Sequence, residues 1–443
     1  MWTKLTVLEE LFSNIANAIR TKNSTTDKLK AGTFFTDINN LNFFQKKISI
    51  TTWPSASVTL TKPNETTITN TANMSGVTNF ILDIPGTYIV ESRNGSMSKS
   101  ITIVVEETDK YIIKSDNMFV RGANPANLAI GTTQLGAASV GNYILFGGGI
   151  NTSNARTNVV EAYNTSLVKS TATELLQAGS YLVGITFGNY AIFAGGYVGG
   201  TTYSNSISTY NSSLVRGTAT ALTTGCSNNA ATVVNDKLFI AGGQSSTSKI
   251  SNVDVYSNTL VKSTATALSS PVYNNAATTV GNYALFAGGN DGTTSKSTVD
   301  AYNTSLVKSS ATALSTAKDS ISGSYNSKYG LIAGGGDTIV DAYSTSLVKS
   351  IPSSSAYSKR YQIGITFKDY ACILGGFMSG LYFDLFEAWD NALTKIYGDP
   401  MTLGRCWPTA AATSNLLLVG GGQCAVGSPP FTNNVDSYTF NTI

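Results

Sequence analysis

Residues 141–149 read GNYILFGGG, and this short apolar run ending in glycines returns six times in the C-terminal part of the chain. The later copies are GNYAIFAGG (188–196), NDKLFIAGG (235–243), GNYALFAGG (281–289), SKYGLIAGGG (327–336), KDYACILGG (368–376) and TSNLLLVGGG (413–422). Their first paired glycines, taken as Gly148, Gly195, Gly242, Gly288, Gly334, Gly375 and Gly420, stand 41 to 47 residues apart. The chain therefore contains seven copies of one repeating unit.

An aromatic residue closes another apolar run after each glycine pair. These residues are Tyr163, Tyr210, Tyr256, Tyr302, Tyr343, Trp389 and Tyr438. Several short strands within a period of about 40 to 50 residues are typical of a propeller blade. We therefore expect residues 109–443 to form a seven-bladed β-propeller.

The ends of the repeat array predict how the propeller closes. The last copy stops at residue 443, before its outer strand, while residues 124–135 share an 11-residue Asn-to-Leu step with residues 164–175. A strand near 124–135 would complete the last blade and remove two exposed sheet edges.

The repeat resembles the kelch family in its glycine pair after an apolar strand and in the tyrosine that follows. It departs from that family because Lys169, Arg216, Lys262 and Lys308 stand where a kelch repeat usually has tryptophan. The resemblance implies a kelch-like propeller, but we carry over no kelch partner. Copper oxidases built on kelch propellers use histidine ligands, and this chain has no histidine.

Residues 1–45 show the pattern of an α-helical hairpin. Thr6 and Glu9 have capping-box spacing, and an apolar face follows at steps of three and four residues. Its expected attachment face is Leu8, Leu11, Phe12, Ile15 and Ile19. A hairpin this small buries too little apolar surface to be stable alone, so we expect it to bind another protein or to make the chain a homo-oligomer.

The segment IANAIRTKNSTTDKLKAGTFFTDINNL (15–41) resembles the N-terminal helical module of tail and baseplate proteins of phages that infect Firmicutes. The resemblance covers about 40 residues and includes the Thr-Thr-Asp-Lys turn. It implies that other tail or baseplate proteins are the partners of this end, and that the chain is a virion component made in the host cytoplasm. A generic helical oligomerisation hairpin is the alternative.

Residues 46–108 alternate between apolar and polar side chains, which is typical of strands. Asn94-Gly95 separates the last two strand-like runs and predicts a hairpin. The Pro-Gly-Thr-Tyr-x-Val entry at 85–90 resembles bacterial immunoglobulin-like modules. We therefore expect a small Ig-like β-sandwich that serves as a spacer.

Composition excludes several classes of function. The net charge of +3 is small and dispersed, so we expect no nucleic-acid partner. No apolar run approaches the roughly 18 to 20 residues of a membrane span, and the acidic amphipathic start does not resemble a signal peptide. Without histidine or a C-x-x-C pair, the sequence predicts no metal site and no cofactor. The four cysteines are interpreted as reduced residues of the core or turns.

Repeated positions favour structural roles over chemistry. The glycine pairs are followed by no helical pattern that would make a phosphate loop, so we expect turns with positive φ and close backbone packing. The aromatic residues at one fixed position predict repeated packing. Carboxylates also recur at one position, for example Asp254 and Asp300, and we interpret them as hydrogen-bonding residues of the blade. We predict no catalytic residue and no enzymatic activity.

Residues outside the repeat are better candidates for ligand binding. The loops after the glycine pairs vary in content, and aromatic and amide groups at rigid loop tips suit contact with glycans or proteins. The candidates are Tyr197, Tyr203, Asn290, Asp291, Phe377, Tyr382 and Phe431. An ordinary surface loop is the alternative for each of them.

Taken together, the sequence predicts a phage tail or baseplate structural protein that presents a propeller to a bacterial surface glycan or protein. A bacterial adhesin or lectin-like propeller is one alternative. A cell-wall glycan-acting enzyme with carboxylate chemistry is the other, and it would require axial Asp or Glu residues.

Overall fold

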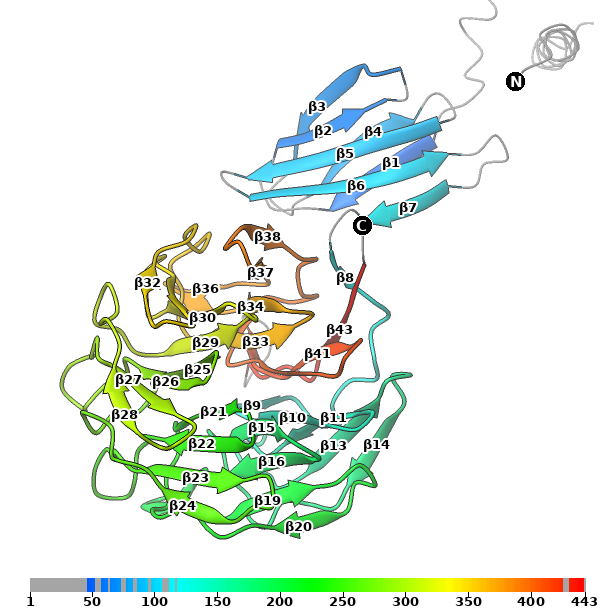
Figure 1. The fold of residues 1–443 in the computed structure, drawn as a ribbon. Coiled ribbons are helices and arrows are strands. Elements are labelled where there is room, and N and C mark those ends of the chain that lie inside the picture. Colours follow the sequence, from blue (N-terminus) through cyan, green and yellow to red (C-terminus); the bar gives the residue numbers. More distant parts are fainter. Residues whose placement is uncertain are drawn as a thin grey trace, which may run out of the picture. The chain divides into compact units, whose positions relative to one another are not determined.

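The computed structural model describes residues 46–51, 57–62, 64–72, 77–82, 86–94, 97–105, 111–115, 118–424 and 430–441. The chain divides into two compact units, Met1–Asp116 and Asn117–Ile443 (Figure 1). All regular structure in the described residues is β, which confirms the expected mainly-β fold, and these residues include no helix that could cross a membrane. The helical hairpin expected over residues 1–45 lies outside the described residues.

The described residues of the first unit form two antiparallel sheets. One pairs β1 (Lys46–Thr51) with β4 (Val77–Leu82). The other has the order β3 (Thr67–Thr71), β2 (Ser57–Thr61), β5 (Gly86–Asn94), β6 (Met97–Val105), β7 (Tyr111–Ser115). Its strands β2 and β5 bury Val58, Leu60, Tyr88 and Val90, in agreement with the alternation of apolar and polar residues.

The first unit extends further along the chain than residue 108. Strand β7 pairs with β6 in the register Ile103↔Ile113, so residues 111–115 belong to this sheet and the division falls after Asp116. The polar run at 106–109, interpreted as a domain junction, therefore connects two strands of one sheet instead. The sequence interpretation missed β7 because its five residues, YIIKS, are too few to show a clear alternation.

Within residues 118–424 and 430–441, seven four-stranded antiparallel sheets follow one another. The first four sheets are, in strand order, β10 (Gly136–Val140), β11 (Tyr143–Gly147), β13 (Val160–Asn164), β14 (Lys169–Ala172); β15 (Val183–Phe187), β16 (Tyr190–Ala194), β19 (Ile207–Tyr210), β20 (Arg216–Thr218); β21 (Ala230–Val234), β22 (Lys237–Ala241), β23 (Val253–Ser257), β24 (Lys262–Thr264); and β25 (Ala276–Val280), β26 (Tyr283–Ala287), β27 (Val299–Asn303), β28 (Lys308–Ser310).

The last three sheets are β29 (Ile321–Tyr325), β30 (Tyr329–Gly334), β31 (Asp341–Ser344), β32 (Lys349–Ser350); β33 (Ile363–Phe367), β34 (Tyr370–Leu374), β37 (Phe386–Trp389), β38 (Lys395–Tyr397); and β40 (Thr409–Ala412), β41 (Leu417–Gly420), β43 (Val435–Phe440), β8 (Phe119–Arg121). Two-stranded pairs lie between some of them: β9 (Thr132–Thr133) with β12 (Ile150–Asn151), β17 (Tyr197–Gly199) with β18 (Thr202–Tyr203), β35 (Phe377–Met378) with β36 (Leu381–Tyr382), and β39 (Arg405–Cys406) with β42 (Gln423–Cys424).

The first strands of successive sheets lie side by side. Strand β10 contacts β15, and the same contact continues through β21, β25, β29, β33 and β40. Figure 1 shows these strands toward the middle of the unit, with the last strands β14, β20, β24 and β28 at its periphery. Each sheet therefore presents its first strand inward and its fourth strand outward.

The strand that completes the last sheet is β8, not the expected strand near 124–135. Phe119 faces Phe440, and residues 124–131 form no strand. The Asn-to-Leu step misled the alignment, because Leu128 and not Leu135 is equivalent to Leu175. The backbone N–H of Leu128 donates to Asn433 O (2.9 Å), as that of Leu175 donates to Asn158 O (2.8 Å). The completing strand must precede Leu128, as β8 does.

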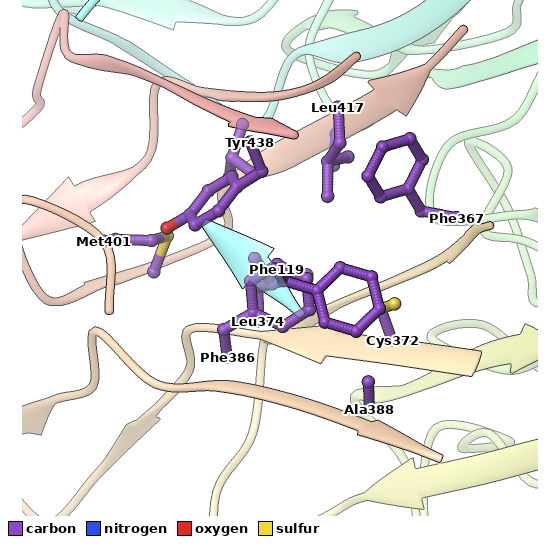
Figure 2. Packing of buried hydrophobic residues seen from close by; sticks show 11 residues of the cluster. Phe119, Phe367, Cys372, Leu374, Phe386, Ala388, Met401, Leu417 and Tyr438 are labelled. Atoms are coloured by element: carbon purple, nitrogen blue, oxygen red, sulfur yellow. The ribbon is translucent and has the colours of Figure 1, made fainter. Parts of the chain in front are cut away.

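Phe119 of β8 lies in a buried cluster formed by the last two sheets. Its ring stacks on Phe386 with centroids 4.8 Å apart and meets Tyr370 edge-on at 5.2 Å. Figure 2 shows Phe119 among Leu374, Phe386 and other apolar side chains of this cluster. This strand thus contributes core packing as well as main-chain hydrogen bonds.

The glycine pairs adopt positive φ, as expected, with Gly148 at 72° and Gly149 at 101°. In the last sheet, however, the equivalent pair is Gly421 (62°) and Gly422 (111°), whereas Gly420 is the end of β41. The run of three glycines at 420–422 allowed two alignments, and conformation selects the second.

Three side chains at repeated positions join a sheet to the one before it, as the third sheet shows. Tyr256, Asp254 and Lys262 all bind the connecting segment 220–223. The Tyr256 hydroxyl donates to the carbonyl of residue 220 (2.8 Å), Asp254 accepts the backbone N–H of residue 223 (2.9 Å), and Lys262 donates to the carbonyl of residue 221 (2.8 Å). The same roles belong to Tyr302, Asp300 and Lys308, and to Tyr343, Asp341 and Lys349. The structural interpretation of the repeated carboxylates and aromatics is confirmed.

Replacing one of these tyrosines by phenylalanine tests the contact. Tyr256→Phe removes the hydroxyl and leaves the carbonyl of residue 220 without this donor, so the free energy of unfolding should fall by about 1 kcal/mol. Tyr163→Phe is the matched control, because the buried Tyr163 hydroxyl has no protein partner. This second variant should be neutral or slightly stabilising in urea denaturation. Equal losses in both variants would contradict the assigned role.

Three cations are buried at one repeat position in consecutive sheets: Lys318, Lys359 and Arg405. Lys359 Nζ lies 2.6 Å from Glu387 Oε2, and neither side chain has exposed surface. Burial alone would raise the pKa of Glu387, but Lys359 and hydrogen bonds hold that pKa below its usual range. Arg405 forms the equivalent ion pair with Asp436, and Lys318 with Asp341 (3.4 Å).

The four cysteines all lie in the described residues, where they are buried and not joined in disulfides. Burial raises the pKa of Cys226, and likewise that of Cys406, to about 12. Their thiols therefore stay protonated at neutral pH, in agreement with the interpretation as core residues.

Candidate functional site

One residue, one or two positions before each first strand, adopts the left-handed backbone conformation. These seven residues form what we call the mouth ring: Gln134, Tyr181, Asn228, Asn274, Ser320, Tyr361 and Trp407. Their φ values lie between 47° and 59°, a region that costs a non-glycine residue about 1 to 2 kcal/mol. Because every sheet has one such residue, the conformation belongs to the common architecture.

Hydrogen bonds connect the mouth ring from sheet to sheet. The backbone N–H of Tyr181 donates to Gln134 O (2.9 Å), and that of Asn228 donates to Tyr181 O (3.0 Å). The pattern continues through Asn274, Ser320, Tyr361 and Trp407 with distances of 2.8 to 3.2 Å. These backbone hydrogen bonds fix the order of the ring residues around the cavity and the positions of their Cα atoms.

The mouth ring surrounds a cavity of about 280 Å³. Its aromatic members gather on one side, where Tyr361 and Trp407 lie with ring centroids 4.3 Å apart and Tyr181 meets Trp407 edge-on at 6.5 Å. Following the ring past Tyr181 leads to the amides of Asn228 and Asn274. We call these two parts the aromatic arc and the amide arc.

The next residue along each chain segment forms the floor beneath the mouth ring. Four sheets have an apolar residue there: Leu135, Leu182, Ile321 and Pro408. The other three have Asn229, Asn275 and Gln362, each at most 9% exposed. Both side-chain polar atoms of Asn229 and Asn275 lack a hydrogen-bond partner in the protein, as does Oε1 of Gln362. Its Nε2 donates to Ala333 O (2.8 Å).

The Tyr181 hydroxyl remains neutral at the mouth. Burial raises the pKa of Tyr181 to about 12, and the nearby Tyr361 contributes in the same direction, while a hydrogen bond from Gln134 opposes them. Below pH 10 this residue is therefore an uncharged hydroxyl beside the aromatic arc.

A second cavity of about 410 Å³ adjoins the first and shares Gly184, Ile363 and Thr409 with it. The first strands of all seven sheets line it, mostly with small or hydroxyl-bearing residues such as Ser139, Thr186 and Thr232. Among the described residues, no group of three carboxylate or cysteine side chains could hold a metal ion.

The loop residues predicted from the sequence lie around the mouth ring. Three of them form isolated backbone β-bridges with the residue directly before a ring residue. The pairs are Tyr197 with Ser180, Asn290 with Tyr273, and Phe377 with Arg360. Tyr203 packs on Tyr197 (5.1 Å), Tyr382 packs on Phe377 (4.8 Å), and Phe431 bridges Gln423. We call this set the rim.

Several rim residues are occupied by contacts within their own loops. Asp291 pairs with Lys296 (2.5 Å), and this contact with further hydrogen bonds holds the pKa of its carboxyl well below the usual range. Asn290 Oδ1 accepts the N–H of Gly292 (2.7 Å). These two side chains thus stabilise the loop, while the aromatic rim residues remain half-buried. The attachment residues Leu8, Leu11, Phe12, Ile15 and Ile19 lie outside the described residues.

Sequence reasoning missed the mouth ring itself. Each ring residue stands 14 positions before the first glycine of a pair, as in Gln134 and Gly148, once Gly421 is taken for the last repeat. This fixed offset is the signal that could have identified it.

Comparisons with known proteins identify no family for this chain. No family model matches the chain, and no curated protein matches it either. A solved structure titled "Structure of YjhT" is similar over 70% of this chain and 96% of its own, at 11% sequence identity and a TM-score of 0.47.

Proposed function

We propose that residues 117–443 form a seven-bladed kelch-like β-propeller that binds a receptor on the bacterial surface through its mouth. The seven four-stranded sheets, the contact of β40 with β10, and the pairing of β8 with β43 all support this architecture. The small β-sandwich before it is an Ig-like spacer. The whole chain is a component of a phage tail or baseplate, attached through its N-terminal helical hairpin.

The observation that carries the binding function is the cavity inside the mouth ring. It combines half-buried aromatic rings with the buried amides of Asn229 and Asn275, whose polar atoms have no protein partner. Buried polar groups without partners are costly, and sites of molecular recognition are where proteins retain them. Because the described residues that line this cavity carry no charge, general acid–base catalysis lacks its usual groups there. A binding protein is the better proposal than an enzyme.

The completing strand β8 pairs with the end of β43 that lies away from the mouth. At the mouth end of the last sheet, the backbone N–H of Gly421 donates to Asn434 O, and that of Thr432 donates to Gly422 O. Phe119 pairs with Phe440 at the other end of this sheet. The chain thus enters the propeller at the end remote from the mouth. The phage context rests on the resemblance of residues 15–41 alone.

Binding of the fluorescently labelled full chain to a panel of Gram-positive strains tests the receptor function. We expect saturable binding that is restricted to certain strains. Absence of binding across a broad panel, with a cooperative unfolding transition retained, would overturn the receptor-binding proposal and favour a purely structural role.

Immunogold labelling distinguishes the phage component from a bacterial adhesin. An antibody raised against the chain should label one end of the tail on particles released from the strain that carries the gene. Label on the cell surface without particles would identify an adhesin instead.

A further inference from the structure

Three sheets have an amide at the floor position, where the other four sheets have an apolar residue. The amides are Asn229, Asn275 and Gln362. Leu182 packs so closely on the neighbouring sheet that a Cβ at Gly148 would lie 2.7 Å from its Cδ2. Asn275 occupies the same place against Gly242, where a Cβ would lie 3.0 Å from its Oδ1. The space therefore accepts leucine, and leucine there would leave no polar atom unpaired. Asparagine at this position lowers stability without improving packing.

Amide groups suit one kind of ligand group in particular. An asparagine side chain offers two donors and an acceptor at one point, and a sugar hydroxyl is likewise both donor and acceptor. Asn229 and Asn275 come from adjacent sheets and line the same cavity, and the polar atoms of both side chains lack a protein partner. Gln362 adds a further unpaired acceptor.

The aromatic arc supplies the complementary surface. Trp407, Tyr361 and Tyr181 are all half-buried and line the same cavity. The C–H face of a pyranose ring is apolar and packs on aromatic rings, while its hydroxyls project from the ring edge toward polar groups. An aromatic arc joined to amides within one small cavity matches this division.

Charge limits the ligand further. Among the described residues that line the cavity, none is charged. Most cations near the cavity are already in ion pairs. Arg360 pairs with Asp319 (3.2 Å), and Lys359 and Arg405 are in buried ion pairs. Arg156 lies over the ring of Tyr197 (4.5 Å), outside the lining of the cavity. A carboxylate or phosphate ligand inside the cavity would lose its hydration and would find no counter-ion among the lining residues.

We propose that the mouth binds an uncharged pyranose of a surface glycan, stacked on Trp407 and hydrogen-bonded by Asn229, Asn275 and Gln362. This inference rests on the proposed receptor function and names its ligand class.

The first test uses the full chain and methyl glycosides of neutral sugars, including glucose, galactose and N-acetylglucosamine, with methyl glucuronide as the anionic comparator. Saturation-transfer NMR reports contact, and the fluorescence of Trp407 should change on binding. We expect at least one neutral glycoside to bind and methyl glucuronide not to bind. Binding of the anionic sugar alone would overturn the proposal.

The second test separates recognition from structure. The double variant Asn229→Leu/Asn275→Leu should weaken glycoside binding at least tenfold and raise the thermal midpoint by a few degrees. A merely structural pair would lower that midpoint. Unchanged affinity would overturn the proposal, and Trp407→Ala provides an independent test of the aromatic arc with the same expected loss. Val261→Ala, an exposed position away from the cavity, is the control that should alter neither property.

Cell binding keeps the two proposals distinguishable. If the full chain binds cells but the leucine and alanine variants bind equally well, the glycan site is wrong and the receptor function stands. Loss of cell binding after protease treatment of the cells would identify a protein receptor and would also overturn the glycan site. If neither cells nor glycosides are bound, both proposals fail.

Discussion

Lys359→Met is expected to lower the free energy of unfolding at pH 7 by about 3 to 5 kcal/mol. Methionine closely matches the shape of the lysine stem, so packing is preserved and the loss is electrostatic. Lys359 Nζ lies 2.6 Å from Glu387 Oε2 in a site without exposed surface. Without this ammonium, the charge of the buried Glu387 carboxylate is stabilised only by a more distant cation and by neutral hydrogen-bond donors.

The pH dependence identifies the cause of this loss. In the native protein the pKa of Glu387 is depressed, so its contribution to stability is present above the unfolded value of about 4.3 and is lost as pH falls through the folded pKa. In the variant, burial dominates and the folded pKa rises above the unfolded one. The difference between native and variant should therefore shrink as pH falls from 7 toward 4.

Urea denaturation across this pH range measures the effect. The double variant Lys359→Met/Glu387→Gln removes both charges and keeps an acceptor for the backbone N–H of Ala356, so it should recover much of the lost stability. A single-variant loss that does not change with pH would contradict the electrostatic explanation.

Gly323→Ala is expected to destabilise the second unit by about 3 kcal/mol, at the upper end of the usual range for overpacking. A Cβ on Gly323 would lie 2.0 Å from Ala277 O on the adjacent first strand, and the neighbouring Gly364 approaches Gly323 in the same way. The obstructing atoms are backbone, which cannot change rotamer to make room. The first strands β25 and β29 would have to separate.

Gly179→Ala is the matched control. Gly179 is buried, but a Cβ there would meet its nearest atom at 3.6 Å, and its φ is not positive. This variant should change the urea midpoint little. Similar losses at both positions would show that the close approach of the first strands is not what requires glycine at 323.

The sequence predicted the repeated sheets better than the strand that completes the last of them. Strand content, the positive φ of the glycine pairs, and the packing roles of Tyr256 and Asp254 followed from residue types at fixed offsets. The completing strand could not be located in this way, because Leu128 and Leu135 are both leucines and only the hydrogen bond to Asn433 O separates them.

The mouth ring escaped prediction for a different reason. Its members share a backbone conformation but no side-chain type, and residues as unlike as Gln134, Ser320 and Trp407 give no visible repeat. Their convergence also depends on seven segments that are far apart in the chain. The rim residues could be proposed because aromatic side chains in variable loops are conspicuous by themselves.

The pairing of β8 with β43 has a consequence for how the protein is made. Phe119 leaves the ribosome some 320 residues before Phe440, its partner in the last sheet. During translation the earlier sheets can assemble in order, but β8 must wait with an unpaired edge and an aromatic ring in water until the final segment has been synthesised. A prematurely terminated product would keep Phe119 and Phe386 accessible to chaperones and proteases. The pairing of β43 with β8 thus marks a nascent chain whose seventh sheet is complete.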